Sequence, residues 1–237
     1  MHDELKRVES SAEWYTSQQL SFDRELVRFR FQTLEPWLIG PRGLELGCGD
    51  GSMTKLLRTR FERLTVVEGS QHLLDQIPDG KEVEKVHSLF EAYQPPAPFN
   101  SVVLEHILEH VENPVDLLKT VRKFVAPGGR AFIGVPNAHS FHRLAAVKMG
   151  MLKDIYELNE RDHAVGHRRV YSWDSLEADL VAAGLTIEKM DGIFFKPFSN
   201  GQIDKFFDAR MVEGFYRLGY DFPRNAAEIS VVCRVRE

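Results

Sequence analysis

The stretch of sequence that decides the fold lies at residues 44–51 and reads LELGCGDG. A strand predicted over 43–48 leads into glycines at alternate positions, and apolar residues at helical spacing begin directly after them. Glycine permits a tight backbone turn and lets a ligand lie against the main chain. The stretch therefore predicts the first strand, turn and helix of an α/β fold, with a ligand site at the turn.

Downstream of this turn, short apolar runs alternate with helical patterns. Such alternation implies parallel strands joined by right-handed crossovers. Pro-Gly-Gly at 127–129 predicts a tight turn into the fifth strand. We therefore expect a Rossmann-like seven-stranded sheet with helices on both faces. The expected strands cover residues 43–48, 64–68, 83–87, 101–104, 130–135, 185–190 and 228–235.

Two segments lie outside this alternating core. Apolar residues at helical spacing over 12–38 predict N-terminal helices within residues 1–40, and a Gly-Pro pair ends them. Residues 41–237 are predicted to form one domain. Within it, about 138–170 has no clear strand pattern and holds several histidines, so we expect a lid insertion after the fifth strand. A further helix is predicted to begin after Ser172, which caps it, and to end at Gly184.

The composition restricts the class of partner. With 30 Lys and Arg against 35 Asp and Glu, the net charge is −5, and the absence of long basic runs disfavours a nucleic-acid partner. Cys48 and Cys233 are far apart and fall in predicted strands, so a disulfide framework is not expected. The sequence has no apolar stretch of signal-peptide or membrane-span length. We therefore expect a cytoplasmic protein without a membrane partner.

An acidic residue supports a cofactor site at the glycine turn. Glu68 stands nineteen residues after Gly49, at the end of the second predicted strand, where a carboxylate can accept hydrogen bonds from both hydroxyls of a ribose. A dinucleotide-binding turn needs its third glycine one position later than Gly51. Asp50 and Glu45 also place negative charge near the turn, which suits a sulfonium and an ammonium group better than a pyrophosphate. A nicotinamide site is therefore disfavoured.

Several motifs together carry a resemblance to one family. They are the glycine turn, the strand ending at Glu68, the loop SLFE at 88–91, the stretch LEHILEHVENP at 104–114 and the Pro-Gly-Gly turn. In combination they resemble the class I S-adenosylmethionine-dependent methyltransferases, with ubiquinone-type small-molecule enzymes among them. The resemblance implies S-adenosylmethionine as cofactor and S-adenosylhomocysteine as product. The cofactor contacts that it implies come from Tyr15, Glu45, Gly47, Gly49, Gly51, Glu68, Gly69, Leu89, Phe90 and Glu105.

Four histidines are candidates for a catalytic base, because methyl transfer to a hydroxyl requires removal of its proton. His106 and His110 would share one face of a helical turn after the fourth strand. His163 and His167 lie in the predicted lid, where the basic pair at 168–169 suits an anionic or polyhydroxyl substrate. The alternative for His110 is a structural histidine that orders its loop, and the alternative for the lid pair is plain solvation.

A metal site is a further alternative at the same place. Glu109 with His106 and His110 resembles the E-x-x-E-H motif of ubiquinone-type O-methyltransferases and small-RNA 2′-O-methyltransferases, whose carboxylates and histidine hold a divalent ion. Here His106 stands at the place of the first glutamate. Our first expectation is therefore that the chain uses no metal, with these three residues as the alternative set.

The favoured function is O-methylation of a small polar molecule, such as a sugar or a natural-product intermediate, with a histidine as general base. The alternatives are N-methylation, metal-assisted 2′-O-methylation of RNA, and a module that binds S-adenosylmethionine without catalysis. The aromatic-rich segment 194–222 predicts packing of C-terminal helices on the sheet or a homodimer contact, with substrate stacking as a further option.

Overall fold

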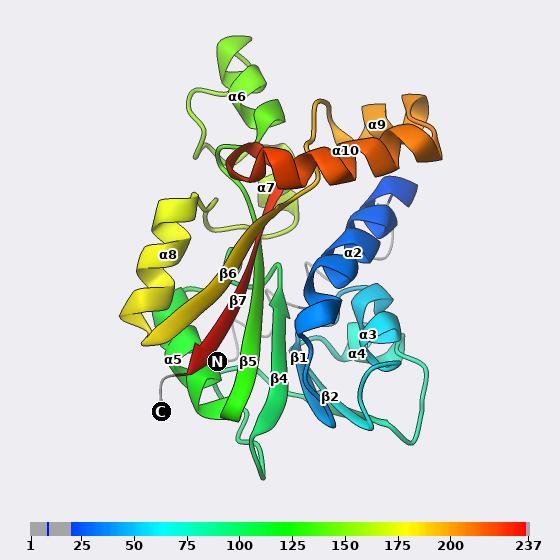
Figure 1. The fold of residues 1–237 in the computed structure, drawn as a ribbon, viewed down its shortest axis with the longest axis vertical. Helices are drawn as coiled ribbons and strands as arrows, with labels where there is room; N and C mark the ends of the chain where they lie inside the picture. Colours follow the sequence, from blue (N-terminus) through cyan, green and yellow to red (C-terminus); the bar gives the residue numbers. More distant parts are fainter. Residues whose placement is uncertain (1–8, 10–19, 236–237) are drawn as a thin grey trace.

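The computed structural model describes residue 9 and residues 20–235, and its centre is one sheet of seven strands (Figure 1). The strand order is β3-β2-β1-β4-β5-β7-β6. The first five strands pair in parallel, while β7 runs antiparallel to both β5 and β6. The predicted seven-stranded α/β sheet is confirmed. The strands are β1 (Arg42–Leu46), β2 (Arg63–Glu68), β3 (Val83–His87), β4 (Phe99–Glu105), β5 (Val125–Pro136), β6 (Leu185–Ile193) and β7 (Glu228–Val235).

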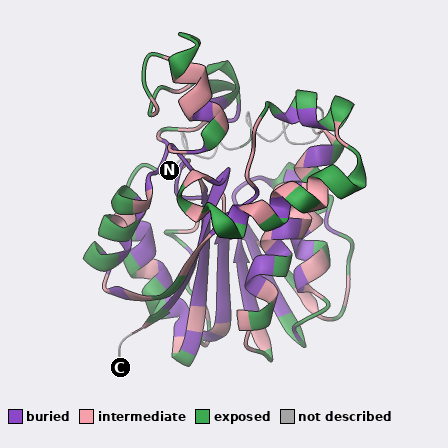
Figure 2. Cartoon of the chain, turned by 45° about the horizontal axis from the view of Figure 1, so that its top comes forward, coloured by how far each residue is buried: buried purple, intermediate pink, exposed green. Residues whose placement is uncertain are grey.

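Helices cover both faces of the sheet, as predicted. One buried apolar cluster joins the sheet to α5 and α8, and a second joins it to α2, α3 and α4. Figure 2 shows the consequence: the strands are buried, and the helices expose their outer sides. The helices are α2 (Ser21–Leu34), η1 (Glu35–Trp37), α3 (Ser52–Leu57), α4 (Gln71–Asp75), α5 (Pro114–Phe124), α6 (Phe141–Lys148), α7 (Glu160–Ala164), α8 (Trp173–Ala182), α9 (Asn200–Phe206), α10 (Ala209–Asp221) and η2 (Pro223–Asn225).

The local signals around α8 and β5 gave one confirmed prediction and one correction. The Ser172 hydroxyl accepts a hydrogen bond from the backbone N–H of Ser175 at 3.1 Å, and Gly184 follows the helix with φ of 77°, so both predicted ends of α8 are confirmed. The Pro-Gly-Gly turn is wrong as a boundary, because β5 already begins at Val125. Its pairing with β4 shifts register there, so 127–129 lie at an irregularity within the strand pair.

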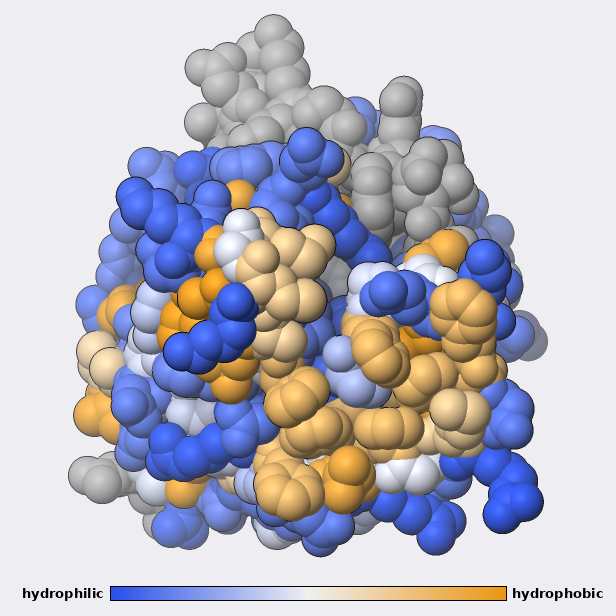
Figure 3. All heavy atoms as spheres, turned by 90° about the horizontal axis from the view of Figure 1, so that it is seen from above, coloured by the Kyte–Doolittle hydropathy of each residue, from blue (hydrophilic) through white to orange (hydrophobic). Residues whose placement is uncertain are grey.

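A third apolar cluster lies at the end of the molecule where α9 and α10 meet α2 and the end of β6. Its centre is aromatic: the rings of Phe29 and Tyr216 stack at 4.0 Å between centroids, and Phe194 packs beside Phe29. Other aromatic residues of the segment 194–222 are exposed, and Figure 3 shows apolar side chains gathered on this end. The segment therefore packs on α2 and on β6 of the sheet, and the homodimer contact stays a prediction.

The segment 138–170 stands beyond the carboxyl ends of the parallel strands, between β5 and α8 (Figure 1). It carries α6 and α7, and the structure describes no strand longer than an isolated bridge at its borders. Its role as a lid stays a prediction. In the described part of the chain, no helix has the length and apolar character needed to cross a membrane.

Candidate active site

The glycine turn after β1 depends on left-handed backbone conformations. Gly47, Gly49 and Gly51 have φ values of 79°, 50° and 76°, which favour glycine strongly. A Cβ atom at Gly47 would lie 2.3 Å from the side chain of Ile107, whereas one at Gly49 would meet nothing within 4 Å. A side chain at Gly47 would require the Ile107 side chain to shift as well as a strained backbone, and the turn leaves an open surface at Gly49 against which a ligand can lie.

Glu68 is fixed beside this turn by backbone donors. Its two carboxylate oxygens accept hydrogen bonds from the N–H of Ser70 at 2.9 Å and of Cys48 at 3.1 Å. Burial raises the pKa of Glu68, although these backbone donors oppose the shift. A carboxylate oxygen can accept more than one hydrogen bond, so the buried group keeps acceptor capacity for two hydroxyls. This geometry fits the predicted contact with a ribose.

Glu45 is a second buried acid at the turn, but it lacks donors. It is 2% exposed, and neither carboxylate oxygen has a hydrogen-bond partner among the described residues. Burial raises the pKa of Glu45 to about 8. A buried carboxyl group is costly without donors, and the Thr54 hydroxyl is the one side-chain donor of the described residues that acts on the pKa of Glu45. The ammonium group predicted for the ligand would supply a further donor, so the residues present fit the predicted cofactor.

The predicted adenine loop lies close to the same turn. The ring of Phe90 lies 3.6 Å from the Cβ position of Gly47, and the N–H of Ser88 donates to the carbonyl of Glu68 at 3.0 Å. Leu89 between them is half-buried, and the carbonyl of Gly69 lies 3.0 Å from His87 Nε2. The structure thus brings the loop to the end of β2, while Tyr15 lies outside the described residues.

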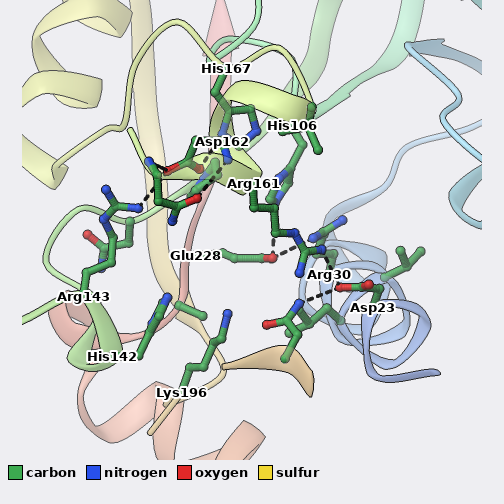
Figure 4. A pocket seen from close by; sticks show the side chains of 18 residues that line it. Asp23, Arg30, His106, His142, Arg143, Arg161, Asp162, His167, Lys196 and Glu228 are labelled. Carbon is green, nitrogen blue, oxygen red and sulfur yellow. Dashed lines mark hydrogen bonds and ion pairs between the residues drawn. The ribbon is translucent and has the colours of Figure 1, made fainter. Parts of the chain in front are cut away.

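A polar cavity of about 240 Å³ opens beyond the ends of β4, β5 and β7 (Figure 4). Its walls come from α2, from the segment 136–167, from residues 196–200 and from the start of β7. Ten of the eighteen lining side chains are the acids, bases and histidines labelled in Figure 4. Such a lining suits a small molecule with several polar groups better than an apolar one.

His106 enters this cavity from the end of β4, but not on a helix. Its φ of 58° is rare for a residue other than glycine, and residues 106–113 form turns that lead to Pro114, where α5 begins. The expected helical turn is therefore wrong, and His106 and His110 do not share a helix face. The physical reason is packing: Ile107, Leu108 and Val111 are buried in the core and hold the segment down.

Carboxylates surround the His106 ring. Its Nδ1 lies 3.1 Å from Glu109 Oε1 and its Nε2 lies 3.3 Å from Glu228 Oε1. Arg30 on α2 holds Glu228 with two hydrogen bonds of 2.7 and 2.6 Å. Burial and Arg30 lower the pKa of His106, but the two carboxylates outweigh them, and that pKa rises to about 9. Burial opposes the shift, but the pKa of Glu109 falls to about 2, because the charges of His106, His110 and His167 and the hydrogen bond of His106 together outweigh it.

Glu105, predicted to contact the cofactor, belongs to the same group of acids. It ends β4, and both of its carboxylate oxygens lack a hydrogen-bond partner in the portion of the chain that the structure covers. Burial raises the pKa of Glu105 to about 7, with opposing contributions from Arg30 and His106. Its cofactor contact stays a prediction.

A second group of polar residues joins the lid segment to the turn after β4. His167 Nδ1 lies 2.9 Å from Asp162 Oδ1, and the other oxygen of Asp162 accepts a hydrogen bond from Arg143 at 3.2 Å. One ligand atom each from Glu109, His110 and His167 lies within 4.8 Å of the others. A carboxylate that orients a histidine is a common support for a metal ligand. These residues could hold a divalent cation, with His167 in the place predicted for His106.

The four candidate histidines thus separate. His106 and His167 line the cavity, His110 contacts the His167 ring edge to face at 4.8 Å between centroids, and His163 is exposed on α7 outside the cavity. Sequence reasoning missed other charged groups that line the cavity. Two signals were available in the sequence. Glu228 is an acid at the start of an apolar strand, and Arg30 is a cation between two buried phenylalanines of α2. The missed residues include Arg30, Glu228, His142 and Lys196.

These features define an α/β fold with a glycine turn after β1 and a cavity lined by charged residues beside His106. A family model described as a methyltransferase domain matches residues 19–190. The chain therefore belongs to the methyltransferase domain family, and it is an S-adenosylmethionine-dependent methyltransferase.

Similar proteins include curated relatives of one name. The ubiquinone biosynthesis O-methyltransferase of Aeromonas salmonicida (strain A449) is 28% identical over 171 residues, covering 69% of this chain and 70% of the relative. The protein of the same name from Azotobacter vinelandii (strain DJ / ATCC BAA-1303) is 26% identical and covers 84% of this chain and 89% of its own length.

Solved structures share the fold at low sequence identity. The N-methyltransferase NodS from Bradyrhizobium japonicum WM9, in complex with S-adenosyl-L-homocysteine, superposes with a TM-score of 0.62 at 15% identity, covering 99% of this chain and 98% of its own. The [4+2]-cyclase SpnF superposes with a TM-score of 0.60 at 15% identity, covering 88% of this chain and 80% of its own. Proteins with different functions in their names share this fold, so the fold does not identify the acceptor.

Proposed function

We propose that this methyltransferase acts on a hydroxyl of a small polar acceptor, with His106 as the general base. The observation that carries the proposal is the position of His106 Nε2. His106 lines the cavity, and this buried nitrogen lies 3.3 Å from Glu228 Oε1 without hydrogen-bond geometry among the residues described. A buried nitrogen in a cavity wall is suited to receive a proton from a bound hydroxyl.

The chemistry follows from in-line displacement. S-adenosylmethionine, when bound, supplies an electrophilic methyl group on a sulfonium. The acceptor oxygen forms a bond to the methyl carbon as the carbon–sulfur bond breaks, and the proton of the hydroxyl passes to His106 Nε2. Glu109, 3.1 Å from Nδ1, stabilises the imidazolium that forms. The acceptor hydroxyl must therefore lie between the methyl donor and His106.

The relatives favour oxygen as the methylated atom, because those reported above are named O-methyltransferases. The cavity favours a small acceptor, since its volume is about 240 Å³ and several segments of the chain form its walls. The net charge of −5 also opposes binding of RNA.

The test is a methyl-transfer assay against hydroxylated small molecules with paired histidine variants. His106→Gln should lower kcat by about 10²- to 10⁴-fold, the range for loss of a general base, and should leave affinity for S-adenosylhomocysteine close to that of the wild type. His163→Gln, at an exposed position outside the cavity, should keep wild-type kcat.

A His106→Gln enzyme that turns over at the wild-type rate would exclude His106 as the base. If only amines are methylated, the proposed O-methylation is wrong and the protein is an N-methyltransferase. Tight cofactor binding without turnover on any acceptor would favour the non-catalytic module.

A second candidate is metal-assisted transfer, and the cluster of Glu109, His110 and His167 favours it. A divalent cation held there would lower the pKa of an acceptor hydroxyl. Metal content of the purified protein, measured for the wild type and for His167→Ala, decides between the two. Stoichiometric metal that is lost in His167→Ala supports this candidate, and full activity in chelator excludes it.

A further inference from the structure

The cavity has two ends lined by different charged groups. His106 stands at one end among Glu109 and Glu228, and Lys196 projects into the other end beside His142 (Figure 4). Small molecules that carry both a hydroxyl and a charged group can match such a division, because complementary charge fixes which way round they bind.

Lys196 differs from the other cations of the cavity in lacking a partner. Arg30 binds Glu228, Arg143 binds Asp162 at 3.2 Å, and Arg161 lies 3.1 Å from Asp23. No hydrogen bond or ion pair holds the Lys196 ammonium within the described ranges, residue 9 and residues 20–235. Lys196 is half-buried, and a cation partly withdrawn from water without a counter-charge is costly to the folded protein.

The charge environment of Lys196 agrees with this description. Burial lowers the pKa of Lys196 to about 8, repulsion from Arg161 and Arg143 adds to the shift, and Glu228 and Asp23 oppose it from a distance. An anion placed against the ammonium would relieve the cost of its burial.

His142 supplies a second unsatisfied group at the same end. Its Nδ1 is buried and lacks a hydrogen-bond partner among the described residues. Burial, together with Lys196 and Arg143, lowers the pKa of His142 to about 2, so the ring is neutral at physiological pH. A neutral imidazole donates one hydrogen bond, and a carboxylate or phosphate oxygen accepts such a bond from the ring next to the one from the ammonium.

The backbone holds Lys196 in place through a constrained residue. Phe194 has φ of 62°, which is rare for a bulky side chain, and it is fully buried, with its ring 4.9 Å from that of Phe22. The following residue, Phe195, donates its N–H to the carbonyl of Phe215 at 2.9 Å. These contacts fix the backbone immediately before Lys196, so the Lys196 side chain extends into the cavity from a well-held backbone position.

We propose that Lys196 and His142 form a subsite for an anionic group of the acceptor, either a carboxylate or a phosphate. The acceptor class is then a hydroxy acid or a hydroxylated phosphate ester. Its anion binds at the Lys196 end, and the hydroxyl then faces His106. This inference rests on the proposed function for the identity of the acceptor, but binding of the anion requires no turnover.

The experiment is calorimetric titration in the presence of S-adenosylhomocysteine with three probes: 4-hydroxybenzoate, phenyl phosphate and 4-hydroxybenzamide. The wild type should bind one of the anions at least about tenfold more tightly than the amide, and the preferred anion distinguishes carboxylate from phosphate. Lys196→Met should lower the affinity for that anion by about 10- to 100-fold, because one charge-assisted hydrogen bond is lost. Lys205→Met, an exposed lysine on α9 outside the cavity, should bind as the wild type does.

Equal affinity for acid and amide in the wild type would overturn the subsite, as would absence of anion binding or an unchanged affinity in Lys196→Met. Lys196→Arg keeps the positive charge and should retain most of the affinity, which shows that loss in Lys196→Met is not loss of fold. His106→Gln separates the two proposals, because it should bind the anion normally while methyl transfer is lost. If both variants keep methyl transfer but only Lys196→Met loses the anion, the general-base role fails and the subsite stands.

Discussion

The predicted cofactor half of the site, which consists of the glycine turn with Glu45, Glu68 and the loop at 88–90, comes from one stretch of the chain. The acceptor half, formed by the cavity around His106, Glu228 and Lys196, is assembled from α2, the end of β4, the segment 136–167, residues 196–200 and the start of β7. The first half relies on backbone conformation and backbone donors. The second relies on charged side chains that balance one another across the fold.

The difference teaches that the two halves should fail in different ways. A change in the cofactor half removes contacts to a ligand, whereas a change in the acceptor half also leaves a buried charge without its partner. Cofactor affinity and the free energy of unfolding can therefore be read as separate reports on the two halves.

The largest expected effect is on stability, from Arg30→Met in the acceptor half. Arg30 and Glu228 are 14% and 7% exposed and share two hydrogen bonds. Removing the guanidinium leaves the Glu228 carboxylate buried with only His106 near it, and the free energy of unfolding should fall by about 3 kcal/mol. Urea denaturation measures this change.

Arg28→Met is the matched control, because Arg28 lies on the same helix with 39% exposure and pairs with an exposed acid. Its loss should cost less than about 1 kcal/mol. Similar losses for the two variants would show that the Arg30–Glu228 pair behaves as a surface pair and would break the contrast between the halves.

The same contrast explains what could be predicted from the sequence. The seven-stranded α/β sheet and the glycine turn could be predicted because glycine spacing, the acid at Glu68 and the alternation of strands and helices are local patterns. The helical turn at His106 was wrong because burial of Ile107 and Leu108 decided the conformation, and that is a tertiary effect. Arg30 and Glu228 are 198 positions apart, so no local pattern indicates their contact.

Glu68→Ala gives the next effect, and it falls on the cofactor half. The substitution removes two hydrogen-bond acceptors for the ribose and leaves the N–H groups of Cys48 and Ser70 without their partner. Affinity for S-adenosylhomocysteine, measured by calorimetry, should fall by about 100-fold or more. Arg30→Met should change this affinity little, and equal losses of affinity in the two variants would show that the halves are not separable.

The smallest expected effect is a shift in pH dependence within the acceptor half. His106 accepts a proton only when its ring is neutral, and its pKa is raised to about 9. The value of kcat/KM should therefore rise with pH through neutrality and level off above about 9. Measurement under limiting acceptor, with chelator present to remove any bound cation, gives this profile.

Glu109→Gln sharpens the assignment, because the carboxylate lies 3.1 Å from Nδ1 and favours the protonated ring. Without that negative charge the pKa of His106 should fall, and the midpoint of the profile should move to lower pH by about one unit, equivalent to about 1.4 kcal/mol. Glu112→Gln, in the same turn but exposed, should leave the midpoint in place. A midpoint that stays fixed in Glu109→Gln would mean that another group titrates in the profile. Loss of the Glu109 charge makes His106 a weaker base, and its ring is then neutral over a wider pH range. A midpoint that moves to lower pH in Glu109→Gln therefore shows that the charges around His106 control its proton transfer.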